Sequence, residues 1–195
     1  MYEKIVKRLI DIMIALILSP VVLIITIPVG IIIKLEDHGT IFYNAPRYGK
    51  DMKKFKMYKY RTMKMNSPDI RNSDGTTFNS EKDVRLTKIG SVLRKTSIDE
   101  IPQIFNILLG DMSLVGPRPS PMGNEKTYTA YIKKKFNVKP GITGYNQAYL
   151  RNKATIEERY QNDIYYAGNV SFMLDFKIIV KTIKSVFLQK NIYNH

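Results

Sequence analysis

Between Ile12 and Ile33 the chain reads IMIALILSPVVLIITIPVGIII, 22 residues without a charged side chain. A helix needs about 20 predominantly apolar residues to cross the hydrocarbon core of a bilayer. A cleaved signal peptide fits poorly, because the segment is long and no small-x-small cleavage pattern follows it. The segment therefore predicts a membrane helix, which either crosses the bilayer or enters and leaves by the same face.

Two features of the segment bear on that choice. Pro20, preceded by Ser19, lies near its middle and removes a helical hydrogen bond, and Pro28 adds a second interruption. Both flanks are basic: Lys4, Lys7 and Arg8 precede the segment, and Lys34, Arg47, Lys50, Lys53 and Lys54 follow it. Because cytoplasmic flanks carry the excess of Lys and Arg, a re-entrant helix bent at Ser19 and Pro20 would keep both ends cytoplasmic. Proline is tolerated in membrane helices, so residue chemistry alone slightly favours a simple span.

The composition narrows the chemistry of the whole chain. Its 195 residues carry 31 Lys and Arg against 17 Asp and Glu, a formal charge of +14. There is no Cys and the only histidines are His38 and His195, which excludes disulfides and thiolate chemistry and leaves almost nothing for a zinc site or a Ser-His-Asp triad. Carboxylate chemistry remains, together with a hard cation such as Mg²⁺. The positive excess favours nucleic acid, an anionic membrane surface or a phosphorylated substrate.

Downstream patterns predict short strands, a loop and a final helix. Residues 41–43 and the alternating residues 54–61 predict two strands of a small β-hairpin, joined through residues 49–51. Residues 66–83, rich in Asn, Ser, Asp and Gly, predict a surface loop. Residues 171–190 predict an amphipathic helix that lies in the membrane interface or packs on the core. Its apolar side is Phe172, Phe176, Ile179, Ile183, Val186 and Phe187, and its basic side is Lys177, Lys181 and Lys184.

Two adjacent carboxylates stand in the sequence RKTSIDEIPQ, residues 94–103. An apolar face at helical spacing predicts a short helix that ends at Gly110 and has Asp99 and Glu100 in its first turn. The members of this face are Ile101, Ile104, Phe105, Leu108 and Leu109. Ser97 and Glu100 also have the spacing of a capping box, which needs no catalytic role, but Pro102 would lie too deep in a helix capped by Ser97. Ionised carboxylates here can hold Mg²⁺ or act as nucleophiles.

A second motif, GDMSLVGPRP at residues 110–119, holds Arg118 between two prolines. A guanidinium on a stiff, extended segment suits bidentate recognition of phosphate, although an ordinary salt bridge in a rigid loop has the same signature. The sequence KPGITG at residues 139–144 has the composition of tight turns whose N–H groups can face an anion, which is a weak signal by itself.

Together these motifs resemble the bacterial sugar transferases known as monotopic phosphoglycosyl transferases, of the small single-domain type, over nearly the whole chain. The resemblance rests on KRLID at residues 7–11, Ser19-Pro20, YKYRTM at residues 58–63, residues 94–103, residues 110–119 and PGITG at residues 140–144. It implies a re-entrant helix broken at Ser19 and Pro20, in place of the span that residue chemistry favours.

The resemblance also implies a reaction and roles for single residues. A sugar 1-phosphate would pass from a UDP-sugar to undecaprenyl phosphate, through an aspartyl phosphosugar, to give undecaprenyl-diphosphate-sugar and UMP at the start of capsule or exopolysaccharide synthesis. Asp99 would be the nucleophile and Glu100 its partner, both near Mg²⁺. The residues expected to bind substrate phosphate are Lys59, Arg61, Arg94 and Arg118. Where relatives read GWAQVNGRN, residues 144–152 read GYNQAYLRN, so the sugar is not identified.

The expected molecule is a helix-rich, mixed α/β monotopic membrane protein. It has a re-entrant membrane helix over residues 1–36 and a cytoplasmic catalytic domain over residues 37–195, with a small β-hairpin and amphipathic interfacial helices. We expect it at the cytoplasmic face of the bacterial inner membrane, with UDP-sugar, undecaprenyl phosphate and anionic lipid as partners, Mg²⁺ as cofactor and no nucleic acid. A homo-oligomer is left open.

Two alternatives come from other classes of protein. A membrane-tethered basic nucleic-acid-binding module is suggested by Phe55, Tyr58 and Tyr60 among the basic residues. A purely structural membrane subunit is the other. Neither gives a role to the two adjacent carboxylates or to Arg118.

Overall fold

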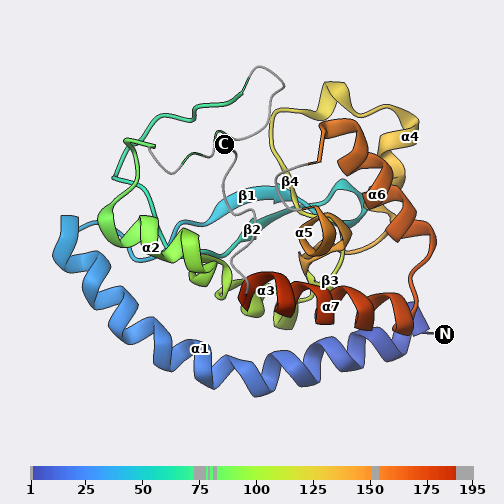
Figure 1. The fold of residues 1–195 in the computed structure, drawn as a ribbon, viewed down its shortest axis with the longest axis horizontal. Helices are drawn as coiled ribbons and strands as arrows, with labels where there is room; N and C mark the ends of the chain where they lie inside the picture. The colour runs from blue at the N-terminus through green and yellow to red at the C-terminus, as the bar shows by residue number, and fades with distance from the viewer. Residues whose placement is uncertain (1, 73–77, 79, 81–82, 151–153, 188–195) are drawn as a thin grey trace.

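The computed structural model describes residues 2–72, 78, 80, 83–150 and 154–187, arranged as Figure 1 shows. The helices are α1 (Lys7–Asp37), α2 (Lys88–Thr96), α3 (Gln103–Leu109), α4 (Ala130–Lys133), α5 (Tyr145–Tyr149), α6 (Ile156–Gly168) and α7 (Phe172–Phe187). The strands are β1 (Ala45–Tyr48), β2 (Lys54–Met57), β3 (Ser113–Val115), β4 (Ser120–Pro121) and β5 (Gly141–Thr143). A π-helical turn (Tyr2–Val6) precedes α1, and 3₁₀ turns occupy Lys50–Met52, Ile98–Glu100, Glu125–Thr127 and Lys134–Asn137. The expected helix-rich, mixed α/β fold is confirmed.

The apolar segment forms one helix, α1, which runs unbroken through Pro20 and Pro28. Figure 1 shows it as a smooth arc along one side of the molecule. Pro20 has no N–H for the carbonyl of Leu16, but Ser19 Oγ donates to that carbonyl at 3.1 Å. A hydroxyl thus replaces the missing N–H, and the break expected at Ser19 and Pro20 is instead a gentle curve. Residues 2–37 are long and apolar enough to cross a membrane by length and composition alone, and re-entry stays a prediction.

One stripe of α1 contacts the rest of the molecule along its whole length. The buried members of the stripe are Asp11, Ala15, Val22, Val29, Gly30 and Ile33. Near the start of α1, Arg8 donates to the carbonyl oxygens of Ile107 and Leu108 at 2.6 and 3.3 Å; at its end, Asp37 accepts from Arg61 at 2.5 Å. Most of the remaining surface of α1 exposes large apolar side chains. Both ends of the helix therefore lie against the same body of protein.

The predicted β-hairpin is confirmed, with its first strand displaced and its second strand ending at Met57 instead of residue 61. β1 and β2 pair antiparallel from Ala45↔Met57 to Tyr48↔Lys54, and β4 pairs with the other edge of β1. Residues 41–43 form no strand, although Phe42 makes an isolated bridge to Tyr60. The prediction for residues 139–144 is wrong in part, because Gly141–Thr143 is a strand, β5, parallel to β3.

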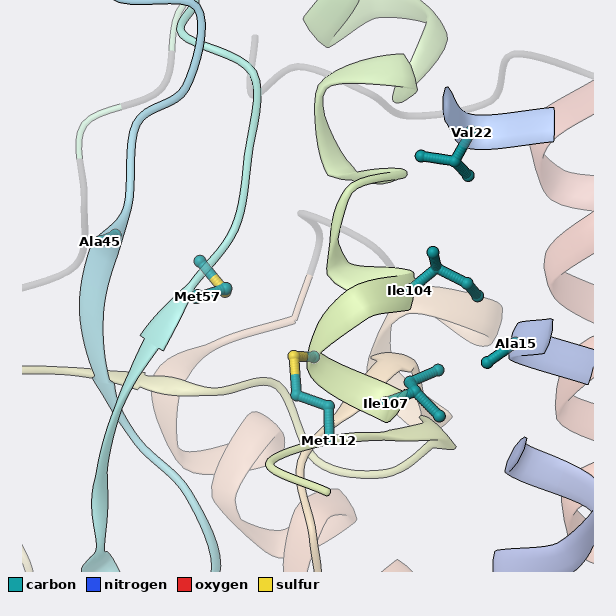
Figure 2. Packing of buried hydrophobic residues seen from close by; sticks show 7 residues of the cluster. All are labelled: Ala15, Val22, Ala45, Met57, Ile104, Ile107 and Met112. Carbon is teal, nitrogen blue, oxygen red and sulfur yellow. The ribbon is translucent and has the colours of Figure 1, made fainter. Parts of the chain in front are cut away.

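The main core lies on two sides of α3. Figure 2 shows α3 between the hairpin and α1, with Ala45 and Met57 on one side and Ala15 and Val22 on the other. Because α3 is enclosed on both sides, Ile107 is fully buried although the sequence pattern left it off the apolar face. Leu109, which that pattern included, ends the helix with 65% of its surface exposed.

The last helix, α7, has two apolar sides. Ile178 is buried against the core, whereas Phe172, Phe176 and Ile183 are more than half exposed. Packing on the core is thus confirmed for one side of the helix, and a place in the membrane interface stays a prediction for the exposed side. The side chains of Val186 and Phe187 lie outside the described residues, as do residues 73–77, 79, 81 and 82 of the predicted loop.

Candidate active site

Asp99 and Glu100 lie in a tight 3₁₀ turn, Ile98–Glu100, between α2 and α3. The capping box does not form: Ser97 makes no side-chain cap bond, and it adopts the left-handed conformation (φ 60°) that ends α2. Pro102 precedes α3 as its N-cap, where its missing N–H costs no helical hydrogen bond. The carboxylates therefore belong to an irregular connection and not to the first turn of a regular helix.

Two cations hold this dyad. Lys59 Nζ lies 2.5 Å from Glu100 Oε1 and 3.6 Å from Asp99 Oδ2, and Arg118 Nη2 lies 3.1 Å from the same Glu100 oxygen. Asp99 is 6% exposed. The structure thus brings together Lys59, Asp99, Glu100 and Arg118 from three separate parts of the chain.

The environment shifts the pKa values of the two carboxyl groups in opposite directions. Burial raises the pKa of Asp99 against the opposing effect of Lys59, and the charge of Glu100 raises it further. Burial alone would also raise the pKa of Glu100, but Lys59 and Arg118 outweigh it and hold that pKa well below its usual range. Glu100 is therefore the more firmly held anion, and Asp99 is the more basic carboxylate of the two.

The segment that carries Lys59 links the dyad to the apolar helix. Tyr60 N donates to the Asp99 carbonyl at 3.0 Å, and the buried Tyr60 hydroxyl lies 2.5 Å from Thr26 Oγ1 of α1. Arg61, expected to bind phosphate, does not contact the dyad. Each of its three nitrogens donates elsewhere, to the Asp37 carboxylate and to the carbonyl oxygens of Thr40 and Met63.

Arg94 projects from the last turn of α2 beside the dyad. Its Nε donates to Thr62 Oγ1 at 3.0 Å, and its charge lowers the pKa of Asp99. α2 can lie this close because it has a glycine where it crosses the backbone of Thr62. A Cβ on Gly90 would be 1.9 Å from the Thr62 carbonyl oxygen.

The loop that carries Arg118 is fixed by close backbone packing. A Cβ on Gly116 would lie 2.3 Å from the Lys139 carbonyl oxygen, and Gly141 N donates to the Pro117 carbonyl at 3.0 Å. Because that N–H is used inside the protein, it is not available to an anion. Residues 139–141 therefore support Arg118 instead of forming a separate anion site.

The dyad offers two oxygen donors for a divalent cation. Mg²⁺ is usually held by one or two carboxylates together with substrate phosphates, and Asp99 and Glu100 both face Lys59 Nζ from within 4 Å. Among the described residues, no three His, Cys, Asp or Glu side chains gather around one point. The donor set therefore fits Mg²⁺ shared with a phosphorylated substrate and not an all-protein cage.

Sequence reasoning did not assign a role to several positioning residues. Asn106 is fully buried in α3, where its side chain accepts from Tyr58 N at 2.9 Å and donates to the Lys56 carbonyl at 2.7 Å. Asp11 accepts from Leu114 N at 3.0 Å, and Asp37 holds Arg61. The hints in the sequence were a polar residue within an apolar helical pattern, as at Asn106, and the place of Asp11 in the KRLID motif.

Comparisons with known proteins show the family of the chain. Residues 2–189 match the family described as bacterial sugar transferase. The chain is 41% identical to the uncharacterized sugar transferase EpsL of Bacillus subtilis (strain 168), covering 96% of this chain and 90% of that protein. It is 35% identical to a UDP-N-acetylgalactosamine-undecaprenyl-phosphate N-acetylgalactosaminephosphotransferase of Aeromonas hydrophila, and 36% identical to a UDP-glucose:undecaprenyl-phosphate glucose-1-phosphate transferase of Klebsiella pneumoniae. The alignments cover 93% and 96% of this chain but only 43% and 41% of those two proteins. The chain belongs to the bacterial sugar transferase family.

Proposed function

We propose that this chain transfers a sugar 1-phosphate from a UDP-sugar to undecaprenyl phosphate, giving undecaprenyl-diphosphate-sugar and UMP. The observation that carries the proposal is the dyad, where a buried Asp99 adjoins a Glu100 neutralised by Lys59 and Arg118. The names of the Aeromonas and Klebsiella relatives support the acceptor and the donor class. Because those names give different sugars at nearly equal identity, they do not choose the sugar here.

In the first half of the reaction, an Asp99 carboxylate oxygen attacks the phosphorus attached to the sugar. A bond forms between that oxygen and phosphorus, and the bond from phosphorus to the bridging oxygen breaks, so UMP leaves with the electron pair. Lys59 and Arg118 stabilise the negative charge that develops on the phosphoryl oxygens. The product is an aspartyl phosphosugar.

In the second half, a phosphate oxygen of undecaprenyl phosphate attacks the same phosphorus and the bond to Asp99 breaks. The carboxylate is restored and the lipid diphosphate sugar leaves. Glu100 keeps Lys59 and Arg118 in place through both steps. When bound by Asp99, Glu100 and substrate oxygens, Mg²⁺ would supply further charge neutralisation and orient the phosphates.

The arrangement of α1 supports a monotopic enzyme at the cytoplasmic membrane face. Its two ends touch one body of protein, and both flanks are basic, as expected if neither end crosses to the outside. Exposed Phe172 and Phe176 of α7 are suited to the membrane interface, and the net charge of +14 to anionic lipid. We keep the division into a membrane helix at 1–36 and a catalytic domain at 37–195. A transferase uses the two carboxylates of the dyad, whereas a nucleic-acid-binding module has no role for them.

Mass spectrometry of the purified, detergent-solubilised protein tests the proposal. The protein is incubated with Mg²⁺ and each member of a UDP-sugar panel, without lipid acceptor. We expect UMP release and a phosphosugar adduct on the peptide that contains Asp99. Asp99→Asn should abolish both, Glu100→Gln should slow both severely, and exposed Asp51→Asn should change neither. An adduct on Glu100, or turnover by sequential kinetics without an adduct, would contradict the assignment of Asp99.

A further inference from the structure

Arg47 is a half-buried arginine whose hydrogen-bonding capacity is almost unused. It lies in β1, opposite Phe55 of β2 and Pro121 of β4. A guanidinium has five N–H donors. The hydrogen bond recorded for Arg47 runs from Nη1 to the adjacent Pro46 carbonyl at the long distance of 3.4 Å. A partly buried guanidinium with most of its donors free of protein partners can bind an anion through charge-assisted hydrogen bonds.

Four other arginines that the structure describes already have an anionic partner. Arg61, Arg71, Arg85 and Arg118 pair with Asp37, Asp69, Asp83 and Glu100, respectively, within 3.1 Å. No carboxylate of the described residues lies within 4 Å of Arg47. The anion that would complete this site is therefore not supplied by that part of the protein.

Strand register places Arg47 on the side of the sheet that faces the dyad. Residues 55, 57 and 59 alternate onto one face, and Tyr43 N donates to the Lys59 carbonyl, which continues the β1–β2 register to Lys59. Met57 on this face packs toward α3, and Lys59 reaches Glu100 just before α3 begins. Arg47, opposite Phe55, thus lies on the same face, about 13 Å along the strands from Lys59 at roughly 3.3 Å per residue.

Arg118 lies near Arg47 because β4, which starts two residues after Arg118, pairs with β1. Burial lowers the pKa of Arg47, and the positive charge of Arg118 lowers it further. Two guanidinium groups that repel each other at a half-buried edge are stabilised by an anion that both can reach. Lys59 and Arg118 thus lie at the dyad, and Arg47 lies close enough to Arg118 for the two charges to interact.

We propose that Arg47 binds the nucleotide-side phosphate of the nucleoside diphosphate sugar, the phosphate that leaves as part of UMP. This inference rests on the proposed function. The phosphorus that Asp99 attacks lies beside Lys59 and Arg118, and the second phosphate extends from there toward Arg47. Arg47 is thus a donor-binding residue and has no contact with the lipid phosphate.

Measuring the two half-reactions separately distinguishes binding of the UDP-sugar by Arg47 from a general effect of Arg47 on the enzyme. In a ping-pong reaction, kcat/KM for the UDP-sugar reports the first half-reaction alone, and kcat/KM for undecaprenyl phosphate reports the second. We expect Arg47→Gln to lower the first value at least tenfold, because charge-assisted hydrogen bonds are lost, and to leave the second unchanged. Arg47→Lys should recover part of the loss, since it keeps charge without the planar fork. Lys56→Gln, which removes one charge from the opposite face of β2, is the matched control and should change neither value.

An equal fall in both kcat/KM values, or no fall in either, would overturn the role of Arg47. Binding of UMP, measured by calorimetry, gives a second test: Arg47→Gln should weaken it about tenfold, whereas binding of inorganic phosphate should weaken less. If Arg47→Gln does not fold, the kcat/KM values and UMP binding of Arg47→Lys are compared with those of wild type instead. If wild-type protein releases no UMP from any UDP-sugar, the proposed function fails. Equal UMP binding by wild type and variant overturns the Arg47 assignment by itself.

Discussion

Arg118 contacts Glu100 through one nitrogen, and its side chain is 57% exposed. An exposed guanidinium held in this way can turn its other donors toward a phosphate without breaking a buried network. The neighbouring prolines limit how far its backbone can adjust. Arg118 is therefore positioned to move with a substrate by its side chain alone.

Arg118→Lys tests whether the planar fork matters. Lysine keeps the charge but cannot bind phosphate through two parallel hydrogen bonds, so we expect kcat to fall about tenfold or more. The thermal midpoint should hardly change, because surface ion pairs contribute little to stability. Turnover close to that of wild type would leave the bidentate role without support.

At the scale of elements, the close crossing of α2 over the strand segment keeps Arg94 near the dyad. Gly90→Ala puts a methyl group into the Thr62 carbonyl, so α2 must shift. We expect a loss of stability of about 1–3 kcal/mol, as for overpacking in a core. Activity should fall more than the loss of folded protein explains, because Arg94 and the turn with Asp99 follow α2. Ser91→Ala, one residue along α2, is the control for stability and for kcat.

The pair of Asp37 and Arg61 anchors the end of α1 to the segment that carries Lys59. Arg61 is buried, so removing either partner leaves an uncompensated charge, and we expect each of Asp37→Asn and Arg61→Gln to cost about 2–3 kcal/mol. In a double-mutant cycle the two losses should not add. Asp69→Asn, in the exposed pair with Arg71, should cost less than about 1 kcal/mol.

The same variants decide between an anchor and a phosphate ligand at Arg61. If Arg61 is an anchor, Asp37→Asn and Arg61→Gln should change the enzyme alike. If Arg61 binds substrate, Arg61→Gln alone should raise the KM for the UDP-sugar. A selective rise of that kind would restore the role that the family resemblance implies.

At the scale of the whole molecule, the topology of α1 is the main prediction. Because the chain lacks Cys, each substitution introduces a single thiol at an exposed position. Glu3→Cys places it before the helix, and Asn44→Cys places it after the helix. Both should resist an impermeant thiol reagent applied outside intact cells, and both should react after permeabilisation. Labelling at one end only would mean a true span.

Pro20→Leu extends that test to the cause of the topology. It restores the N–H that a straight helix needs at that position, so we expect some molecules to become labelled at one end. Val21→Leu, which keeps Pro20, should leave the labelling pattern unchanged. Equal labelling patterns in Pro20→Leu and wild type would show that Pro20 does not set the topology.

Local patterns in the sequence determined the elements and the chemically active residues. The long apolar run, the alternation in residues 54–61 and the amphipathic final segment each depend on neighbours a few residues apart, so α1, β2 and α7 were predictable. Asp99, Glu100 and Arg118 stood out as candidates because an adjacent carboxylate pair and an arginine between two prolines are local signals, and the family resemblance supplied the roles expected of them. The helix-rich α/β class followed from the same patterns.

Only the tertiary structure decided which groups meet and which residues hold them. Arg47 and Arg61 both lie in or near predicted strands. Arg61 has a carboxylate partner, Asp37, whereas Arg47 has none among the described residues. Asn106, Asp11 and Asp37 act through partners 48, 103 and 24 residues away. The unbroken course of α1 likewise depends on whether a neighbouring hydroxyl satisfies one carbonyl. Contacts between distant segments form only when layers pack, because burial and hydrogen bonding at such points depend on groups that are remote in the sequence.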